Sequence, residues 1–302
     1  MNNPAYIAPE SLGDALKIKQ EMGANARVIA GGTDLILRMR DRVFSPKLLI
    51  DLRQASPDTI TCTGGEMRLG AYVTLSQILA DDEITVLFPA LVEACRQFAG
   101  PPIRNLATLG GNIVNASPAA DLVPPLMAYD ANIVLASSAG DRVLALAEFF
   151  TGPGQTVMQA DEILTQIRLP LMPPDSASWF IKLGQRRSMA ISIINLSIRL
   201  TLGAKGAVSD ARIVLGAAAP TPLRAVAAEA LLIGKELSDQ RVDQAAVEAS
   251  RETSPITDVR ASRNYRERMT QVLVRRALLA SWDALGACRT SPRYDRSSPT
   301  GS

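Results

Sequence analysis

Two short glycine-rich segments carry the residue types in this sequence that most clearly indicate chemistry. The first spans residues 30–35 (Ala-Gly-Gly-Thr-Asp-Leu) and the second spans residues 107–113 (Ala-Thr-Leu-Gly-Gly-Asn-Ile). Paired glycines let the backbone approach an anion closely and adopt positive φ, and successive N–H groups in such a turn form an anion-binding nest. Each segment also has a hydroxyl residue that can donate to a phosphate oxygen. Together they predict a diphosphate held from both sides, as in FAD or NAD.

The residues that are missing narrow the chemistry further. The chain has no histidine, which excludes Ser-His-Asp triads and His-ligated zinc. Its three cysteines, Cys62, Cys95 and Cys288, are far apart, so we expect no iron–sulfur cluster on this chain. No P-loop or GxGxxG motif occurs. These absences favour a reaction carried by a bound cofactor rather than by side chains.

Length and composition indicate the broad class of protein to which the chain belongs. A length of 302 residues predicts two or three domains, and 47% hydrophobic with 21% charged residues is typical of a globular protein. The net charge of +2 is too small to indicate nucleic acid or an anionic membrane as a partner. We find no apolar run of membrane-spanning length and no signal-peptide pattern at the start. The expectation is a cytoplasmic protein without a membrane span.

Local patterns place the first glycine segment between a strand and a helix. A helix is predicted at 8–23, a buried strand at 27–30, a second helix at 34–42 and a second strand at 48–52. This is a β-turn-α-β unit with the glycines at the carboxyl end of its first strand. Open α/β sheets bind ligands at that edge.

The pattern changes after residue 59 to short strands and helices. A hairpin is predicted at 60–71 around Gly64-Gly65, a helix opens at Thr74, and another helix spans 84–99. Further strands are predicted at 131–136, 142–146, 162–169, 179–183, 191–201 and 212–219, with a linker at 172–176. Helices are predicted at 225–233, 238–251 and 261–286, followed by a polar tail that we expect to be disordered.

Four stretches in this order resemble one family. They are AGGTDL at 30–35, ATLGGNIVNASPAADLVPPL at 107–126, ARIVLGAAAPTPLRA at 211–225 and SPITDVRASRNYR at 254–266. They are similar to the flavoprotein (medium) subunit of the molybdenum hydroxylases, the family of xanthine dehydrogenase and carbon monoxide dehydrogenase, over roughly residues 4–285.

The resemblance implies an α+β chain built on a two-lobed FAD-binding domain of the PCMH/vanillyl-alcohol-oxidase type. The first lobe would span residues 1–55 and the second residues 56–175. A small CO-dehydrogenase-flavoprotein-like C-terminal domain, with an antiparallel sheet and helices, would span 176–286. The disordered tail would then be 287–302.

The resemblance also implies which residues contact FAD. One side of the cofactor would meet Ala30, Gly31, Gly32, Thr33, Asp34 and Leu35, and the other side Thr108, Gly110, Gly111 and Asn112. Further contacts would come from Phe98, Asp121, Leu164 and Lys182, with Ser117 a polar candidate on the same wall. We expect no catalytic side chain and no metal ligand in this chain.

Several of these residues also have a purely structural interpretation. Thr33 and Thr108 could be helix N-caps, and Asp121 could cap a helix that starts at Leu122. Lys182 could be a solvated lysine on a strand, rather than an ammonium beside the flavin that stabilises the charge of its reduced form. The sequence leaves these alternatives open.

The resemblance implies that this chain is the subunit through which electrons leave the complex to an external acceptor. A small partner with two [2Fe-2S] clusters would pass electrons to FAD on this chain, and a large molybdopterin partner would oxidise the substrate, in a dimer of heterotrimers. Ser188-Met189-Ala190 stand where xanthine-dehydrogenase-like members have acidic residues near the flavin, which argues against NAD as the acceptor. A quinone, a cytochrome, a soluble dye-like acceptor or O2 is compatible with the sequence. The alternatives are a free-standing FAD-dependent oxidoreductase and a non-catalytic nucleotide-binding assembly protein.

Overall fold

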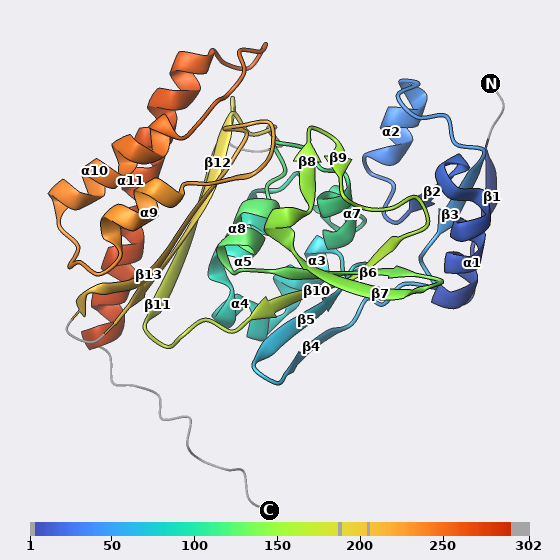
Figure 1. The fold of residues 1–302 in the computed structure, drawn as a ribbon, viewed down its shortest axis with the longest axis horizontal. Coiled ribbons are helices and arrows are strands. Elements are labelled where there is room, and N and C mark those ends of the chain that lie inside the picture. The colour runs from blue at the N-terminus through green and yellow to red at the C-terminus, as the bar shows by residue number, and fades with distance from the viewer. Residues whose placement is uncertain (1–3, 187–188, 204–205, 291–302) are drawn as a thin grey trace, which may run out of the picture.

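Three main sheets follow one another across the molecule, and the helices lie between and beside them (Figure 1). The structure is a computed structural model that describes residues 4–186, 189–203 and 206–290. Each sheet has its own apolar core. The mixture of helices with largely antiparallel sheets confirms the predicted α+β class. None of the described helices combines the length and the apolar character needed to cross a bilayer.

The first lobe is a small parallel sheet with helices packed around it. Its elements are β1 (Ala5–Ile7), α1 (Leu12–Met22), the 3-10 turn η1 (Gly23–Asn25), β2 (Ala26–Ile29), α2 (Leu35–Arg40) and β3 (Leu48–Asp51). The strand β3 lies in the middle and pairs in parallel with β1 and β2, which confirms the β-turn-α-β unit. Ser11 is the N-cap of α1, so this helix starts later than predicted. The short exposed strand β1 was not predicted, because three exposed residues leave no hydrophobic pattern.

The second lobe carries a five-stranded antiparallel sheet in the order β4-β5-β10-β6-β7. Its strands are β4 (Ile60–Thr63), β5 (Glu66–Gly70), β6 (Asn132–Ser137), β7 (Gly140–Ala145) and β10 (Ile163–Pro170), with a small hairpin of β8 (Phe150–Gly152) and β9 (Gln155–Thr156). Its helices are α3 (Leu75–Ala80), α4 (Asp82–Leu87), α5 (Pro89–Gln97), α6 (Pro101–Arg104), α7 (Leu109–Val114) and α8 (Val123–Ala128), with a 3-10 turn η2 (Leu146–Glu148). The predicted hairpin at 60–71 is confirmed as β4 and β5.

The single helix predicted over 84–99 is wrong. The chain forms α4 and α5 instead, and Phe88 stands between them with φ −132° and ψ 56°. Proline disfavours the helical conformation of the residue before it, so Pro89 breaks the helix at Phe88. The Phe88 side chain is fully buried against Tyr129 in an edge-to-face contact, and the break therefore places a core side chain.

The C-terminal domain is an antiparallel sheet with helices packed on one face (Figure 1). Its elements are β11 (Ser176–Leu183), β12 (Ile194–Leu202), β13 (Val208–Gly216), β14 (Leu223–Arg224), α9 (Val226–Leu232), α10 (Asp239–Arg251) and α11 (Arg263–Thr290). The other face of the sheet packs on α5 and α8 of the second lobe. Because α11 continues to Thr290, residues 287–290 of the tail predicted to be disordered are helical. The rest of that tail, residues 291–302, lies outside the described residues.

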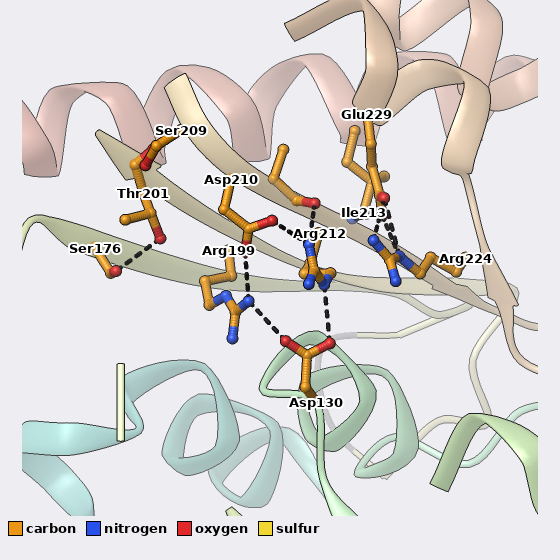
Figure 2. Close-up of polar contacts among 11 residues, drawn as sticks. Asp130, Ser176, Arg199, Thr201, Ser209, Asp210, Arg212, Ile213, Arg224 and Glu229 are labelled. Carbon is orange, nitrogen blue, oxygen red and sulfur yellow. Dashed lines mark hydrogen bonds and ion pairs between the residues drawn. The ribbon is translucent and has the colours of Figure 1, made fainter. Parts of the chain in front are cut away.

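Charged side chains fix the contact between the second lobe and the C-terminal sheet (Figure 2). Asp130 follows α8 and accepts from Arg199 on β12 (2.8 Å) and from Arg212 on β13 (2.9 Å). Both arginines also pair with Asp210. The side chain of Arg199 is only 7% exposed, so these ion pairs are screened less than surface pairs. Beside them, the Tyr129 hydroxyl bonds to that of Ser178 at 2.6 Å.

The segment between α10 and α11 turns around the carboxylate of Asp258. One of its oxygens accepts from the backbone N–H groups of Arg260 (2.8 Å) and Ala261 (3.2 Å) and from the guanidinium of Arg266 (2.7 Å). Burial raises the pKa of Asp258, but these hydrogen bonds outweigh it and lower the pKa from 3.8 to about 2. Such a carboxylate stabilises the fold above its unfolded pKa.

We expect the Asp130→Asn variant to unfold more easily, because a neutral amide leaves two arginines without part of their counter-charge. The free energy of unfolding should fall by about 1 kcal/mol, measured by urea denaturation. Arg251→Gln, which breaks the exposed pair with Glu248, is the matched control and should change stability by less than about 0.5 kcal/mol. Equal effects of the two variants would contradict this account of the interface.

A second prediction concerns the stability of the protein at acidic pH. As the pH falls from about 4 to about 2, the contribution of Asp258 to stability is lost, because the folded carboxylate is then protonated. The free energy of unfolding of Asp258→Asn should therefore fall less steeply over this range than that of the wild type. Asp239→Asn, at an exposed carboxylate of the same domain, should keep the wild-type slope. Coincident curves for Asp258→Asn and the wild type would contradict the prediction.

Candidate functional site

The first glycine segment forms the loop that joins β2 to α2. Gly32 has a positive φ of 68°, which glycine adopts without strain. In the part of the chain that the structure describes, the backbone N–H groups of Gly31, Gly32, Thr33 and Asp34 donate to no protein acceptor. The loop therefore offers a row of donors to an anion, as predicted from the sequence. Thr33 is not the helix N-cap that the sequence allowed, since Asp34 precedes α2 and makes no capping hydrogen bond.

The two glycine segments meet at the junction of the two lobes. A Cβ atom on Gly31 would overlap the carbonyl oxygen of Leu106, directly before the second segment. Nearby, the Arg38 guanidinium of α2 donates to the Asn115 side chain after α7, at 2.8 Å. The lack of a side chain at Gly31 is thus required by close packing of the two lobes.

The second segment differs from the row of free N–H groups that the sequence predicts. Thr108 is the N-cap of α7 and accepts from Gly111 N–H at 3.1 Å. The N–H groups of Leu109, Gly110 and Asn112 donate to Val73, Ala71 and Thr108. All four N–H groups are used, because this segment is the start of a helix that packs on β10 and on the loop after β5.

The second segment offers a ligand the side chain of Asn112 instead of free N–H groups. The Oδ1 atom of Asn112 is buried and has no hydrogen-bond partner among the described residues. A buried acceptor without a partner costs about 1–3 kcal/mol unless a ligand supplies the donor. Gly110 is explained by packing instead, since a Cβ atom there would lie 2.7 Å from the Ala71 carbonyl oxygen and 3.1 Å from Leu164.

A second group of predicted residues surrounds the carboxylate of Asp121, just before α8. Lys182 at the end of β11 donates to one oxygen at 2.5 Å, while Ser192 (2.6 Å) and Asn195 (2.8 Å) donate to the other. The side chains of Asp121 and Lys182 are only 8% and 7% exposed. Lys182 is therefore a buried, paired ammonium and not a solvated one. Asp121 is not a helix cap, since α8 has no side-chain cap.

The Lys182 ammonium reaches an open cavity. Its second hydrogen bond goes to the carbonyl oxygen of Gln97 at 3.4 Å. A lysine has three N–H donors, so one is left for a ligand. The cavity has a volume of about 600 Å³ and is lined by Gln97, Lys182, Leu183, Gly184, Gln185, Arg186, Met189 and Ala190. Its described charged groups are both cationic, which suits a ligand that acquires negative charge.

The remaining predicted residues lie around these two groups. Phe98 follows α5, is half-buried against the central core, and its carbonyl accepts from Arg104 at 2.9 Å. Leu164 is buried on β10 beside Gly110. The Ser117 hydroxyl accepts from Ala119 N–H. Ala30 and Leu35 are the first and last residues of the first segment.

Three further residues of this region, Arg38, Ser192 and Asn195, were not predicted from the sequence. Arg38 reaches across 77 residues and the other two reach Asp121 across more than 70. No local pattern marks contacts at such a separation. In β12 the residues Asn195, Ser197, Arg199 and Thr201 alternate with apolar residues, a pattern typical of a half-buried strand, so the sequence does not mark Asn195 as a buried donor.

Comparison with known proteins finds matches to two protein families along the chain. Residues 2–172 match the family described as the FAD binding domain in molybdopterin dehydrogenase, and residues 179–281 match the CO dehydrogenase flavoprotein C-terminal domain. The glyceraldehyde dehydrogenase medium chain of Sulfolobus acidocaldarius is 32% identical over 90% of this chain and 96% of its own length. The xanthine dehydrogenase FAD-binding subunit of Escherichia coli O157:H7 is 30% identical, over 93% and 97%.

A solved structure shares the whole fold. It is the carbon monoxide dehydrogenase of Hydrogenophaga pseudoflava that lacks the Mo-pyranopterin moiety, with a TM-score of 0.89 and 31% identity over 93% of this chain and 98% of that one. The relatives are subunits of oxidoreductases, and the matches extend over both parts of the chain. The chain therefore belongs to the family of FAD-binding subunits of the molybdenum hydroxylases, which includes the medium chains of the xanthine and CO dehydrogenases.

Proposed function

We propose that this chain is the electron-exit subunit of a molybdenum hydroxylase, taking electrons from the [2Fe-2S] clusters of a partner and passing them from FAD to an external acceptor. One observation carries the proposal. The unpaired N–H groups of Gly31 to Asp34 and the orphaned Asn112 side chain lie on two segments that meet at the lobe junction, in a chain of this family.

The residues present fit FAD. Free N–H groups at residues 31–34 suit a pyrophosphate, and Asn112 Oδ1 can accept from a hydroxyl or N–H of the cofactor. Lys182 holds an ammonium at the cavity, where it favours the negative charge of a reduced flavin. FAD supplies one- and two-electron transfer when bound, while this chain binds, orients and shields it.

The proposal assigns the metal centres to other chains. Among the described residues, no group of Cys, Asp or Glu side chains is arranged to hold a metal ion. A small [2Fe-2S] subunit would deliver electrons and a large molybdopterin subunit would oxidise the substrate, as two heterotrimers in the cytoplasm. The residues Ser188-Met189-Ala190 stand where xanthine-dehydrogenase-like members have acidic residues, so the proposal includes a quinone, a cytochrome or O2 as acceptor rather than NAD.

We expect the purified complex to contain FAD on this chain and to show iron–sulfur absorbance from a partner. On anaerobic addition of the complex's substrate, the flavin should be reduced only when the [2Fe-2S] subunit is present. Mass identification of the released cofactor and stopped-flow spectra measure this. Turnover by the isolated chain would favour a free-standing oxidoreductase, and FAD that partners never reduce would favour an assembly protein.

The Asn112→Leu variant separates cofactor binding from folding. Because Asn112 Oδ1 is buried without a partner, leucine should leave the FAD-free protein at least as stable. The FAD dissociation constant should nevertheless rise about tenfold, equivalent to 1.4 kcal/mol, in a fluorescence titration. Asn105→Leu, at an exposed amide that bonds to Ser76, is the control and should bind FAD normally. Unchanged FAD affinity in Asn112→Leu would remove this residue from the site.

A further inference from the structure

A single arginine ties together the two loops that surround the Asp121 carboxylate. Arg266 lies in the first turns of α11 and its side chain is 3% exposed. One terminal nitrogen donates to the carbonyl oxygens of Ile193 (2.5 Å) and Ala217 (3.4 Å). The other donates to Asp258 at 2.7 Å. Arg266 thus joins three separate segments of the C-terminal domain.

Arg266 donates to the carbonyl oxygens of two residues, Ile193 and Ala217, and each of them is connected to Asp121. Ile193 follows Ser192, whose hydroxyl donates to the Asp121 carboxylate at 2.6 Å. Ala217 has a positive φ of 57°, and its N–H donates to the carbonyl oxygen of Pro118 at 2.6 Å. Pro118 lies three residues before Asp121 on the same loop. A shift of Arg266 would therefore move both the donor to Asp121 and the loop that carries it.

The type of residue matters at this position. A guanidinium is a planar fork with five donors, so it can reach two carbonyl oxygens and a carboxylate at once, which an ammonium on a flexible stem does less well. The Nε atom of Arg266 is buried without a partner, which lowers its net contribution to stability. The arrangement favours a defined geometry over the greatest stability.

We propose that Arg266, held by Asp258, is a positioning residue for the Lys182–Asp121 pair, so that the C-terminal domain sets how strongly the cavity favours reduced over oxidised FAD. This inference rests on the proposed function. A reduced, deprotonated isoalloxazine ring carries one more negative charge than the oxidised ring. The Lys182 ammonium stabilises that charge only while Asp121 holds it at the cavity wall.

The test uses the full chain loaded with FAD. Spectroelectrochemistry gives the midpoint potential, which reports the ratio of the dissociation constants of oxidised and reduced FAD. For Arg266→Lys we expect this preference for reduced FAD to fall about tenfold, a potential about 30 mV lower for a two-electron couple. In a background carrying both Lys182→Met and Asp121→Asn, Arg266→Lys should cause no further shift, because no ammonium remains to be positioned.

Arg224→Lys is the matched control. It weakens another arginine pair of the same domain, that of Arg224 with buried Glu229 (Figure 2), at 2.7 Å. We expect it to lower the melting temperature without changing the potential. A change in melting temperature alone for Arg266→Lys, or the same potential shift in both backgrounds, would overturn the inference.

A second variant keeps the inference testable if Arg266→Lys does not fold. Ser192→Ala removes one donor to Asp121 and leaves Arg266 in place. Its potential should fall in the same direction, and an unchanged potential would overturn the inference. Failure of the wild-type chain to bind any FAD would instead overturn the proposed function on which the inference rests.

Discussion

A buried carboxylate at Asp121 is the constraint on which the candidate site depends. A charge removed from water must be paired and hydrogen-bonded, or it destabilises the fold. Asp121 belongs to the second lobe, but its donors Lys182, Ser192 and Asn195 all come from the C-terminal domain. Folding of one part is therefore coupled to correct docking of the other. The match to the FAD binding domain ends at residue 172, so all three donors to Asp121 lie beyond it.

A second group of ion pairs, around Asp130, also fixes how the C-terminal domain docks on the second lobe. Asp130, nine residues further along the chain, pairs with Arg199 and Arg212 on the same sheet that carries Asn195 (Figure 2). Two anchors on opposite ends of α8 prevent the helix from sliding or rotating on the sheet. The apolar core alone would not fix that register, because hydrophobic contact is not directional.

Local patterns in the sequence were enough to predict the strands and helices near the glycine-rich segments. The hairpin of β4 and β5 and the β2–α2–β3 unit follow from alternation and from glycines at strand ends. The break at Phe88 was signalled by Pro89, but the apolar pattern on both sides concealed it. The glycines themselves were harder to interpret. Gly31 and Gly110 lack side chains because Leu106 and Ala71 lie against them, and a sequence does not distinguish a glycine that faces a ligand from one that faces protein.

The features of the site that were not predicted depend on contacts between residues far apart in the sequence. Asp121 and Lys182 were identified through the family resemblance, and their pairing across 61 residues came only from the structure. The link from Arg266 to Ile193 spans 73 residues and leaves no periodic trace. Within the stretch 254–266, Arg266 binds Asp258 and also the carbonyl oxygen of Ile193, beside the site.

The pairing of Lys182 with Asp121 has a consequence for how the cavity can act. Together the two groups are neutral, so their field falls off faster than that of a lone ammonium and depends strongly on orientation. An unpaired lysine would tolerate displacement, but a paired one favours negative charge only on the side that its free N–H faces. A site built on such a pair needs a rigid support. The buried guanidinium of Arg266, with its contacts to Ile193, Ala217 and Asp258, has the geometry to provide it.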